Sequence, residues 1–168
     1  MRIALAAVAA IAIAAPAFAQ DAAPFTGARA GVTLGWDKTH GQDGFTYGGA
    51  IGYDKAIAPK ITVGAEATLE DSTTKFGGIH ASRDLAISGR VGYVLTPKLL
   101  GFAKVGYDTT RIEAGAPGHT NLEGVRFGGG LEYAVTPHTY ISTEYRRTEY
   151  EDNFGGRDAV IAGLGVRF

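Results

Sequence analysis

Apolar and polar side chains alternate with a period of two along most of the chain from residue 27 to the C-terminus. Residues 30–36, for example, run Ala-Gly-Val-Thr-Leu-Gly-Trp, and residues 160–168 run Val-Ile-Ala-Gly-Leu-Gly-Val-Arg-Phe. Successive side chains of a β-strand point to opposite faces, so this alternation predicts strands with one apolar face. The 25 glycines also disfavour long helices, because a glycine inside a helix costs about 1 kcal/mol relative to alanine. The pattern therefore predicts an all-β protein.

Short turns and longer polar stretches divide this alternation into strands. Three turns are centred on prolines, which stand where no ladder N–H is needed: Pro59, Pro97 and Pro137. Four polar stretches rich in Gly, Asp, Thr and His are interpreted as loops: residues 37–44, 71–83, 109–122 and 148–158. Three turns and four loops make seven connections, which join eight strands.

The two faces of the predicted strands differ in size and charge. One parity carries most of the bulky side chains and no charge, whereas Gly, Ala, Ser and Thr crowd the other between charged residues. The charged residues of that second parity are Arg29, Glu66, Arg90, Lys104, Arg126, Glu132, Glu144 and Arg167. A soluble barrel also alternates, with its apolar face inward, but small and charged residues suit the inside of a narrow barrel and bulky ones suit lipid. We therefore predict an eight-stranded antiparallel up-and-down transmembrane β-barrel.

Aromatic residues of the apolar parity gather at the two ends of the predicted strands. Tyr53, Tyr93 and Tyr133 lie near the proline turns, and Trp36 and Tyr107 lie near the loops. Tyr and Trp prefer the headgroup level of a bilayer, where the ring is in an apolar layer and its polar tip is wet. Two girdles of this kind are typical of membrane barrels.

The N-terminus has the composition of a signal peptide. Arg2 supplies a positive charge, residues 3–15 an apolar run, and residues 17–19 the small-x-small cleavage site Ala-Phe-Ala. The predicted organisation is a signal peptide, a short periplasmic segment and a barrel domain, at residues 1–19, 20–26 and 27–168.

Charge and cysteine content exclude several kinds of partner and site. The net charge of −1 carries no basic excess, so no nucleic-acid partner is expected. The chain has no cysteine, so neither disulfides nor thiolate metal sites stabilise it. Pairing and packing alone must hold the barrel together.

The final strand resembles the assembly signal of outer-membrane proteins. Phe168 ends the chain, and apolar residues precede it at every second position: Val166, Leu164, Ala162 and Val160. Together with the run Leu-Leu-Gly-Phe-Ala-Lys-Val-Gly-Tyr at residues 99–107 and Glu-Tyr-Arg at 144–146, the chain resembles the OmpA-type and opacity-porin-like outer-membrane barrel family. This resemblance implies insertion by the outer-membrane assembly machinery. It implies no particular activity.

Charged residues near the middle of the predicted bore are candidates for a salt-bridge network. They are Glu66, Arg90, Lys104, Arg126, Glu132 and Glu144, with Arg146 just above them. Arg90 is expected opposite Lys104 on the neighbouring strand, where the two cations repel unless a carboxylate lies between them. Glu66 is expected to bridge to Arg90 or Lys104. Such a network is either a gate in a narrow channel or a plug that fills the bore. The interior of an eight-stranded barrel leaves little room for water, which favours the plug.

Other candidate sites are weaker. His40, His80 and His119 fall in three predicted loops but lack close ligand spacing, so no metal or cofactor is expected. His80 and Ser82 match the His-x-Ser pair of a lipid A deacylase in three residues only, and nucleophile and base would also need an orienting group. We expect no enzymatic activity. Arg147, beyond the apolar band, is a candidate contact for lipopolysaccharide phosphates.

The function expected from the sequence is structural: a monomeric outer-membrane barrel, exported through the periplasm, that supports the envelope and displays four surface loops. Its expected partners are outer-membrane lipid, lipopolysaccharide and the assembly machinery. The alternatives are a narrow porin for small solutes and an adhesin or hemin-type ligand-binding surface protein. Since the chain ends at Phe168, no peptidoglycan-binding domain is expected.

Overall fold

The computed structural model describes residues 25–39, 41–73, 75–76, 79–114, 119–150 and 155–168. The predicted signal peptide and most of the predicted periplasmic segment lie outside these residues. The strands are β1 (Gly27–Thr39), β2 (Gln42–Ala58), β3 (Ile61–Ser72), β4 (Lys75–Phe76), β5 (Ile79–Thr96), β6 (Leu99–Ala114), β7 (His119–Ala134), β8 (Thr139–Tyr150) and β9 (Gly156–Arg167). In the described part of the chain, no helix is long and apolar enough to cross a membrane.

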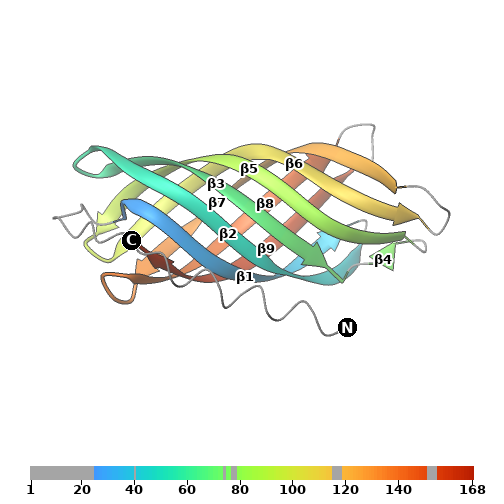
Figure 1. The fold of residues 1–168 in the computed structure, drawn as a ribbon, viewed down its shortest axis with the longest axis horizontal. Coiled ribbons are helices and arrows are strands. Elements are labelled where there is room, and N and C mark those ends of the chain that lie inside the picture. Colours follow the sequence, from blue (N-terminus) through green and yellow to red (C-terminus); the bar gives the residue numbers. More distant parts are fainter. Residues whose placement is uncertain (1–24, 40, 74, 77–78, 115–118, 151–154) are drawn as a thin grey trace.

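Eight strands close into an antiparallel barrel (Figure 1). They pair in the order β3-β2-β1-β9-β8-β7-β6-β5, and the pairing of β5 with β3 completes the ring. The two-residue β4 pairs with the start of β5 and stands outside the ring. The start of β1, the C-terminus and the β2–β3, β5–β6 and β7–β8 connections lie together at the left end in Figure 1. The predicted fold class is therefore confirmed.

The strands extend well into the stretches predicted to be loops, so those loop boundaries are wrong. Thr39 of β1 pairs with Gln42 of β2, which turns the first predicted loop into a hairpin. The other strand bounds continue into the remaining three stretches in the same way. A hairpin ladder continues for as long as backbone groups can pair, and threonine favours strands. The polar residues of these stretches therefore belong partly to solvated strand ends, and their presence does not mark the point at which strand pairing stops.

The barrel is apolar outside and charged inside. Its exposed large hydrophobic side chains all have the parity predicted to face lipid, with Ile87 at 65% and Trp36 at 59% exposure. In contrast, Asp108 and Glu132 are only 0% and 1% exposed. Monomeric soluble proteins rarely expose continuous apolar surface of this extent. The soluble-barrel alternative is therefore excluded.

Aromatic side chains mark both ends of the apolar surface. Tyr53, Tyr93 and Tyr133 are exposed near the proline turns, and Trp36 and Tyr107 are exposed at the opposite end. At that opposite end the rings also have polar partners. The Tyr107 hydroxyl donates to Glu123 at 2.6 Å, and Trp36 Nε1 lies 3.4 Å from Asp43 Oδ1. This is the amphipathic position of a headgroup-level girdle.

Candidate functional site: the charged bore

The side chains that point into the barrel form two layers of ion pairs. We call the layer nearer the proline turns the inner tier: Arg29, Asp54, Glu66, Arg90, Lys104, Glu132, Glu144 and Arg167. We call the layer nearer the opposite end the outer tier: Asp37, Glu70, Asp84, Asp108, Arg126, Arg146 and Arg157.

Asp54 lies at the centre of one half of the inner tier. Its Oδ2 accepts from Arg29 Nε at 2.9 Å, from Arg90 Nη1 at 3.0 Å and from Arg167 Nη1 at 3.1 Å. Glu132 closes this group, because it accepts from Arg90 Nη2 and Arg167 Nη2, each at 2.7 Å. Charge-assisted bonds of this kind are about twice as strong as neutral ones.

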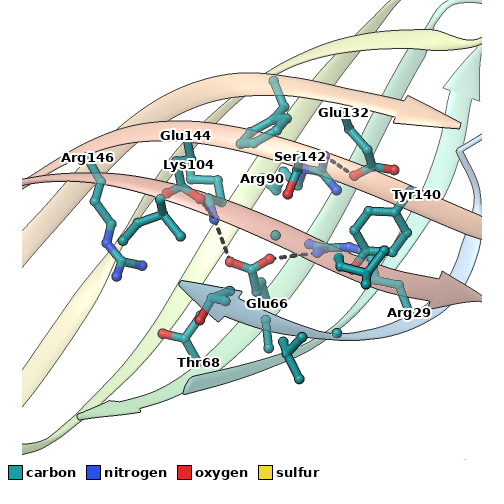
Figure 2. Close-up of a pocket in the computed structure, with 18 residues that line it drawn as sticks. Arg29, Glu66, Thr68, Arg90, Lys104, Glu132, Tyr140, Ser142, Glu144 and Arg146 are labelled. Atoms are coloured by element: carbon teal, nitrogen blue, oxygen red, sulfur yellow. Dashed lines mark hydrogen bonds and ion pairs between the residues drawn. The ribbon is translucent and has the colours of Figure 1, made fainter. Parts of the chain in front are cut away.

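Glu66 links that group to the other half of the inner tier (Figure 2). One carboxylate oxygen accepts from Arg29 Nη1 at 2.6 Å and the other from Lys104 Nζ at 2.6 Å. Lys104 also lies 2.5 Å from Glu144. Of the two partners expected for Glu66, the structure pairs it with Lys104, while the carboxylates of Asp54 and Glu132 contact Arg90.

Arg90 and Lys104 lie directly opposite each other on β5 and β6, as the register predicted. An aromatic ring lies against both cations. The Phe102 ring centroid is 4.2 Å from the Arg90 guanidinium and 5.4 Å from the Lys104 ammonium. A cation over an aromatic face is attracted by the ring quadrupole. Together with the carboxylates, this ring lets two like charges share one side of the bore.

The outer tier joins opposite walls of the barrel. Arg157 Nε donates to Asp37 and its Nη1 donates to Asp84, each at 2.8 Å. Arg126 Nη2 donates to Asp84 at 2.7 Å and also to Asp108. A further pair joins β8 to β3, since Arg146 donates to Glu70.

Six charged members of the bore were missed by the sequence analysis: Asp37, Asp54, Glu70, Asp84, Asp108 and Arg157. Each of these residues has the inward parity of its strand. Each lies, however, just before the predicted start or just after the predicted end of that strand. Carrying the strand parity one step further would have found Asp54, after Gly52, and Glu70, after Thr68. The polar composition around the others concealed them.

Glycines make room for the charged side chains. A Cβ at Gly64 would overlap Asp54 Oδ1, and a Cβ at Gly52 would come within 3.0 Å of Arg29 Nη2. Both positions face the bore beside the inner tier. Their missing side chains let several guanidiniums and carboxylates fit into a narrow interior.

Little space is left in the middle of the bore. The described side chains enclose a cavity of about 30 Å³, lined by Arg29, Glu66, Arg90, Lys104 and Glu144 among others (Figure 2). One water molecule needs about 10–15 Å³ measured in this way, so the cavity has room for about two. A larger cavity of about 320 Å³ lies at the turn end, and its lining includes Glu132, Tyr140 and Arg167. The inner tier therefore lies between this turn-end cavity and the rest of the bore.

The remaining sequence candidates lie away from the bore. Arg147 is on the outer surface, where it pairs with Glu149 at 2.5 Å and with Asp158 at 3.2 Å. By register, Asp43, Lys38, Asp158 and Arg147 form a row of alternating charge across β2, β1, β9 and β8. The candidate lipopolysaccharide contact is thus flanked by carboxylates.

The histidine candidates cannot be placed as a site. His40 and the side chains of His80, Ser82 and His119 lie outside the described residues. His138 lies at the turn end, with Nδ1 3.3 Å from the Arg167 carbonyl oxygen. Within the described residues no group of His, Cys, Asp and Glu has the arrangement of a metal site.

The terminal strand presents its predicted residues to the lipid side. Val160, Leu164, Val166 and Phe168 are 57%, 53%, 42% and 41% exposed, and Ala162 is exposed between them. The Phe168 backbone N–H donates to the Ala28 carbonyl at 2.8 Å. The C-terminus is therefore fixed to β1, with its outward side chains accessible.

Comparison with known proteins supports the fold. The family model described as the outer membrane protein beta-barrel domain matches residues 4–168. Comparison of the sequence with curated proteins finds no match. Among solved structures, Ail, the attachment invasion locus protein of Yersinia pestis, aligns with a TM-score of 0.60 and 14% identity, over 85% of this chain and 97% of Ail.

Two further structures illustrate how different the roles on this fold are. Neisserial surface protein A aligns with a TM-score of 0.59 and 16% identity, over 84% of this chain and 96% of its own. The outer membrane enzyme PagL aligns with a TM-score of 0.51 and 13% identity, over 82% of this chain and 99% of its own. At these identities the likeness establishes the fold and leaves the role to be argued from the bore.

Replacing Glu66 by Ala should destabilise the barrel by roughly 3 kcal/mol, because two cations lose a carboxylate in a dry interior. The effect should lie at the low end of the range for broken buried pairs, since Arg29 retains Asp54 and Lys104 retains Glu144. Urea unfolding of the protein refolded in lipid vesicles measures this change.

The matched control is Glu149→Ala, which removes a carboxylate from an exposed ion pair. Exposed pairs contribute little to stability, so its unfolding midpoint should equal that of the wild type. Equal midpoint shifts for the two variants would contradict a special role for charges buried in the bore.

Proposed function

Because this chain belongs to the outer membrane protein beta-barrel domain family, we propose that it is a structural outer-membrane protein whose bore is closed by its own side chains. It spans the membrane as an integral β-barrel, supports the envelope and presents the connections at its outer end to the surroundings. The observation that carries this proposal is the pair of charge tiers that fills the bore.

Some ion pairs of these tiers join paired neighbouring strands, but others join strands that share no backbone pairing. Arg90 on β5 reaches Asp54 on β2, and Arg157 on β9 reaches Asp84 on β5. A water-filled channel would require such pairs to separate, and each separated charge would then have to be solvated in a bore that is too narrow for much water. These contacts favour a plug over a narrow porin.

Binding and catalytic roles have less support. A hemin-type or adhesive function would depend on the outer connections, and the side chains of the three histidines that motivate it, His40, His80 and His119, lie outside the described residues. We therefore keep the absence of enzymatic activity and of a cofactor as part of the proposal.

The proposed partners are those of a barrel embedded in this membrane. Lipid would contact the apolar outer face, and lipopolysaccharide the charged row that contains Arg147. The assembly machinery would recognise the outward side chains of β9 together with Phe168, which directly follows it. We expect a monomer.

Planar-bilayer recording of the refolded protein tests the closed bore. We expect almost no steady conductance from the wild type, because the two tiers interrupt the water path. Conductance should appear more often for Glu66→Ala, since that variant removes the carboxylate between Arg29 and Lys104. A steady wild-type conductance of the size expected for a water-filled bore would replace the plug by the porin.

Deleting Phe168 tests the proposed assembly signal. In cells the truncated chain should reach the heat-modifiable, membrane-inserted form in markedly lower yield, because the terminal outward side chain is lost. The control is Phe127→Ala, which removes another outward aromatic ring of similar exposure, 44% against 41%. If both variants insert as well as the wild type, or if both lose the same yield, Phe168 has no signalling role beyond its apolar surface.

A further inference from the structure

The two tiers of the bore differ in charge balance. The inner tier contains four cations and four carboxylates, paired as described above. The outer tier contains, among the described side chains, four carboxylates but three guanidiniums. All seven groups of the outer tier are buried, with exposures between 0% and 6%. The described carboxylates of this tier therefore outnumber its cations by one, so at least two carboxylates must share a guanidinium.

The excess charge falls on Asp84 and Asp108. Oδ2 of each carboxylate contacts the same nitrogen, Nη2 of Arg126. Asp84 has a second guanidinium, because Arg157 Nη1 donates to it at 2.8 Å. The other described hydrogen-bond partners of Asp108 are hydroxyl groups: Thr148 Oγ1 at 3.3 Å from Oδ2 and Thr110 Oγ1 at 3.5 Å from Oδ1.

Two carboxylates that converge on one nitrogen in a dry site do not both ionise readily, because like charges repel and neither can be solvated. A single proton between them removes the excess charge and turns one carboxyl group into a hydrogen-bond donor. We propose that Asp84 and Asp108 share one proton in the folded barrel, held mainly on Asp108, and that its loss at alkaline pH loosens the outer tier. This inference rests on the proposed closed bore and adds a pH dependence to it.

Among the described residues, the charged and titratable groups that face this pair come from five other strands of the barrel. They are Asp37 on β1, Glu70 on β3, Arg126 on β7, Arg146 and Tyr150 on β8, and Arg157 on β9. The guanidiniums keep their charge at any accessible pH. Glu70 pairs with Arg146, and Asp37 pairs with Arg157 through Nε, a nitrogen that Asp84 does not contact. Asp84 and Asp108, which converge on one nitrogen of Arg126, are therefore the carboxyl groups at which protonation relieves the most repulsion.

The sign of the effect follows from proton linkage. The unfolded chain has both carboxyl groups ionised near neutral pH, so the folded barrel binds one more proton. Stability must then fall as the pH rises through the range in which the folded barrel releases that proton. Tyrosines ionise only near about pH 10, so an interval from about pH 6 to about pH 9 avoids them.

Urea unfolding of the refolded barrel at both ends of that interval tests the proposal. The wild-type midpoint should be lower at the alkaline end. Asp108→Asn imitates the protonated group, so at about pH 6 its unfolding midpoint should be close to that of the wild type. The midpoint of the variant should then be the same at about pH 9 as at about pH 6. The control is Glu132→Gln in the balanced inner tier, which should lower the midpoint at both pH values and keep the wild-type dependence.

An infrared measurement keeps the proposal testable if Asp108→Asn does not fold. The wild type at about pH 6 should show the C=O stretch of a protonated buried carboxyl group, and that band should disappear towards about pH 9. A wild-type midpoint that does not change with pH, an unaltered pH dependence in Asp108→Asn, or absence of the band would each overturn the shared proton. Failure of the closed bore would look different, as steady wild-type conductance at about pH 6.

Discussion

The bore of this barrel is too narrow to hold its charges in water, and the rest of the structure depends on that constraint. Eight strands enclose an interior just wide enough for side chains. An unpaired buried charge costs several kcal/mol, so every charged group that points inward must find its partner within the barrel. Asp54 with its three guanidiniums, and Glu66 between Arg29 and Lys104, are direct results of this requirement.

Two features of the sequence serve the same requirement. Inward glycines such as Gly52 and Gly64 give up their side-chain volume, so that long charged side chains can cross the interior. The bulky residues move to the other parity, where Trp36, Ile87 and the tyrosine girdles face lipid. A soluble barrel has its apolar side chains inside and its polar side chains outside, and this barrel has the opposite arrangement. The same alternation along each strand provides both the lipid-facing surface and the charged bore.

Strand parity predicted much of this arrangement. It placed Glu66, Arg90, Lys104, Arg126, Glu132, Glu144 and Arg146 inside, and the register at the Pro97 turn brought Arg90 opposite Lys104. The ends of the strands could not be predicted, because polar residues occur both in loops and in strands that continue past their apolar positions. Asp37, Asp84, Asp108 and Arg157 were missed for that reason.

The choice of partners across the bore was also beyond the sequence. Arg146 on β8 meets Glu70 on β3, two strands that share no backbone pairing. Such contacts depend on the tilt of the strands and on the stagger of the closed ring, which adjacent-strand registers in the sequence do not reveal. Local alternation therefore predicts which side chains enter the bore, while closure of the ring decides which of them meet.

A double-mutant cycle on Glu70 and Arg146 tests the central claim most directly, since the described contacts give Arg146 one carboxylate partner across the bore. Unfolding free energies would be measured for Glu70→Ala, Arg146→Ala and the double variant in lipid vesicles. If paired charges close and stabilise the bore, the double variant should lose less than the sum of the single losses, with a coupling of about 1.5 kcal/mol or more. Strictly additive losses would show that the two charges are solvated independently, and would contradict a bore closed by ion pairs.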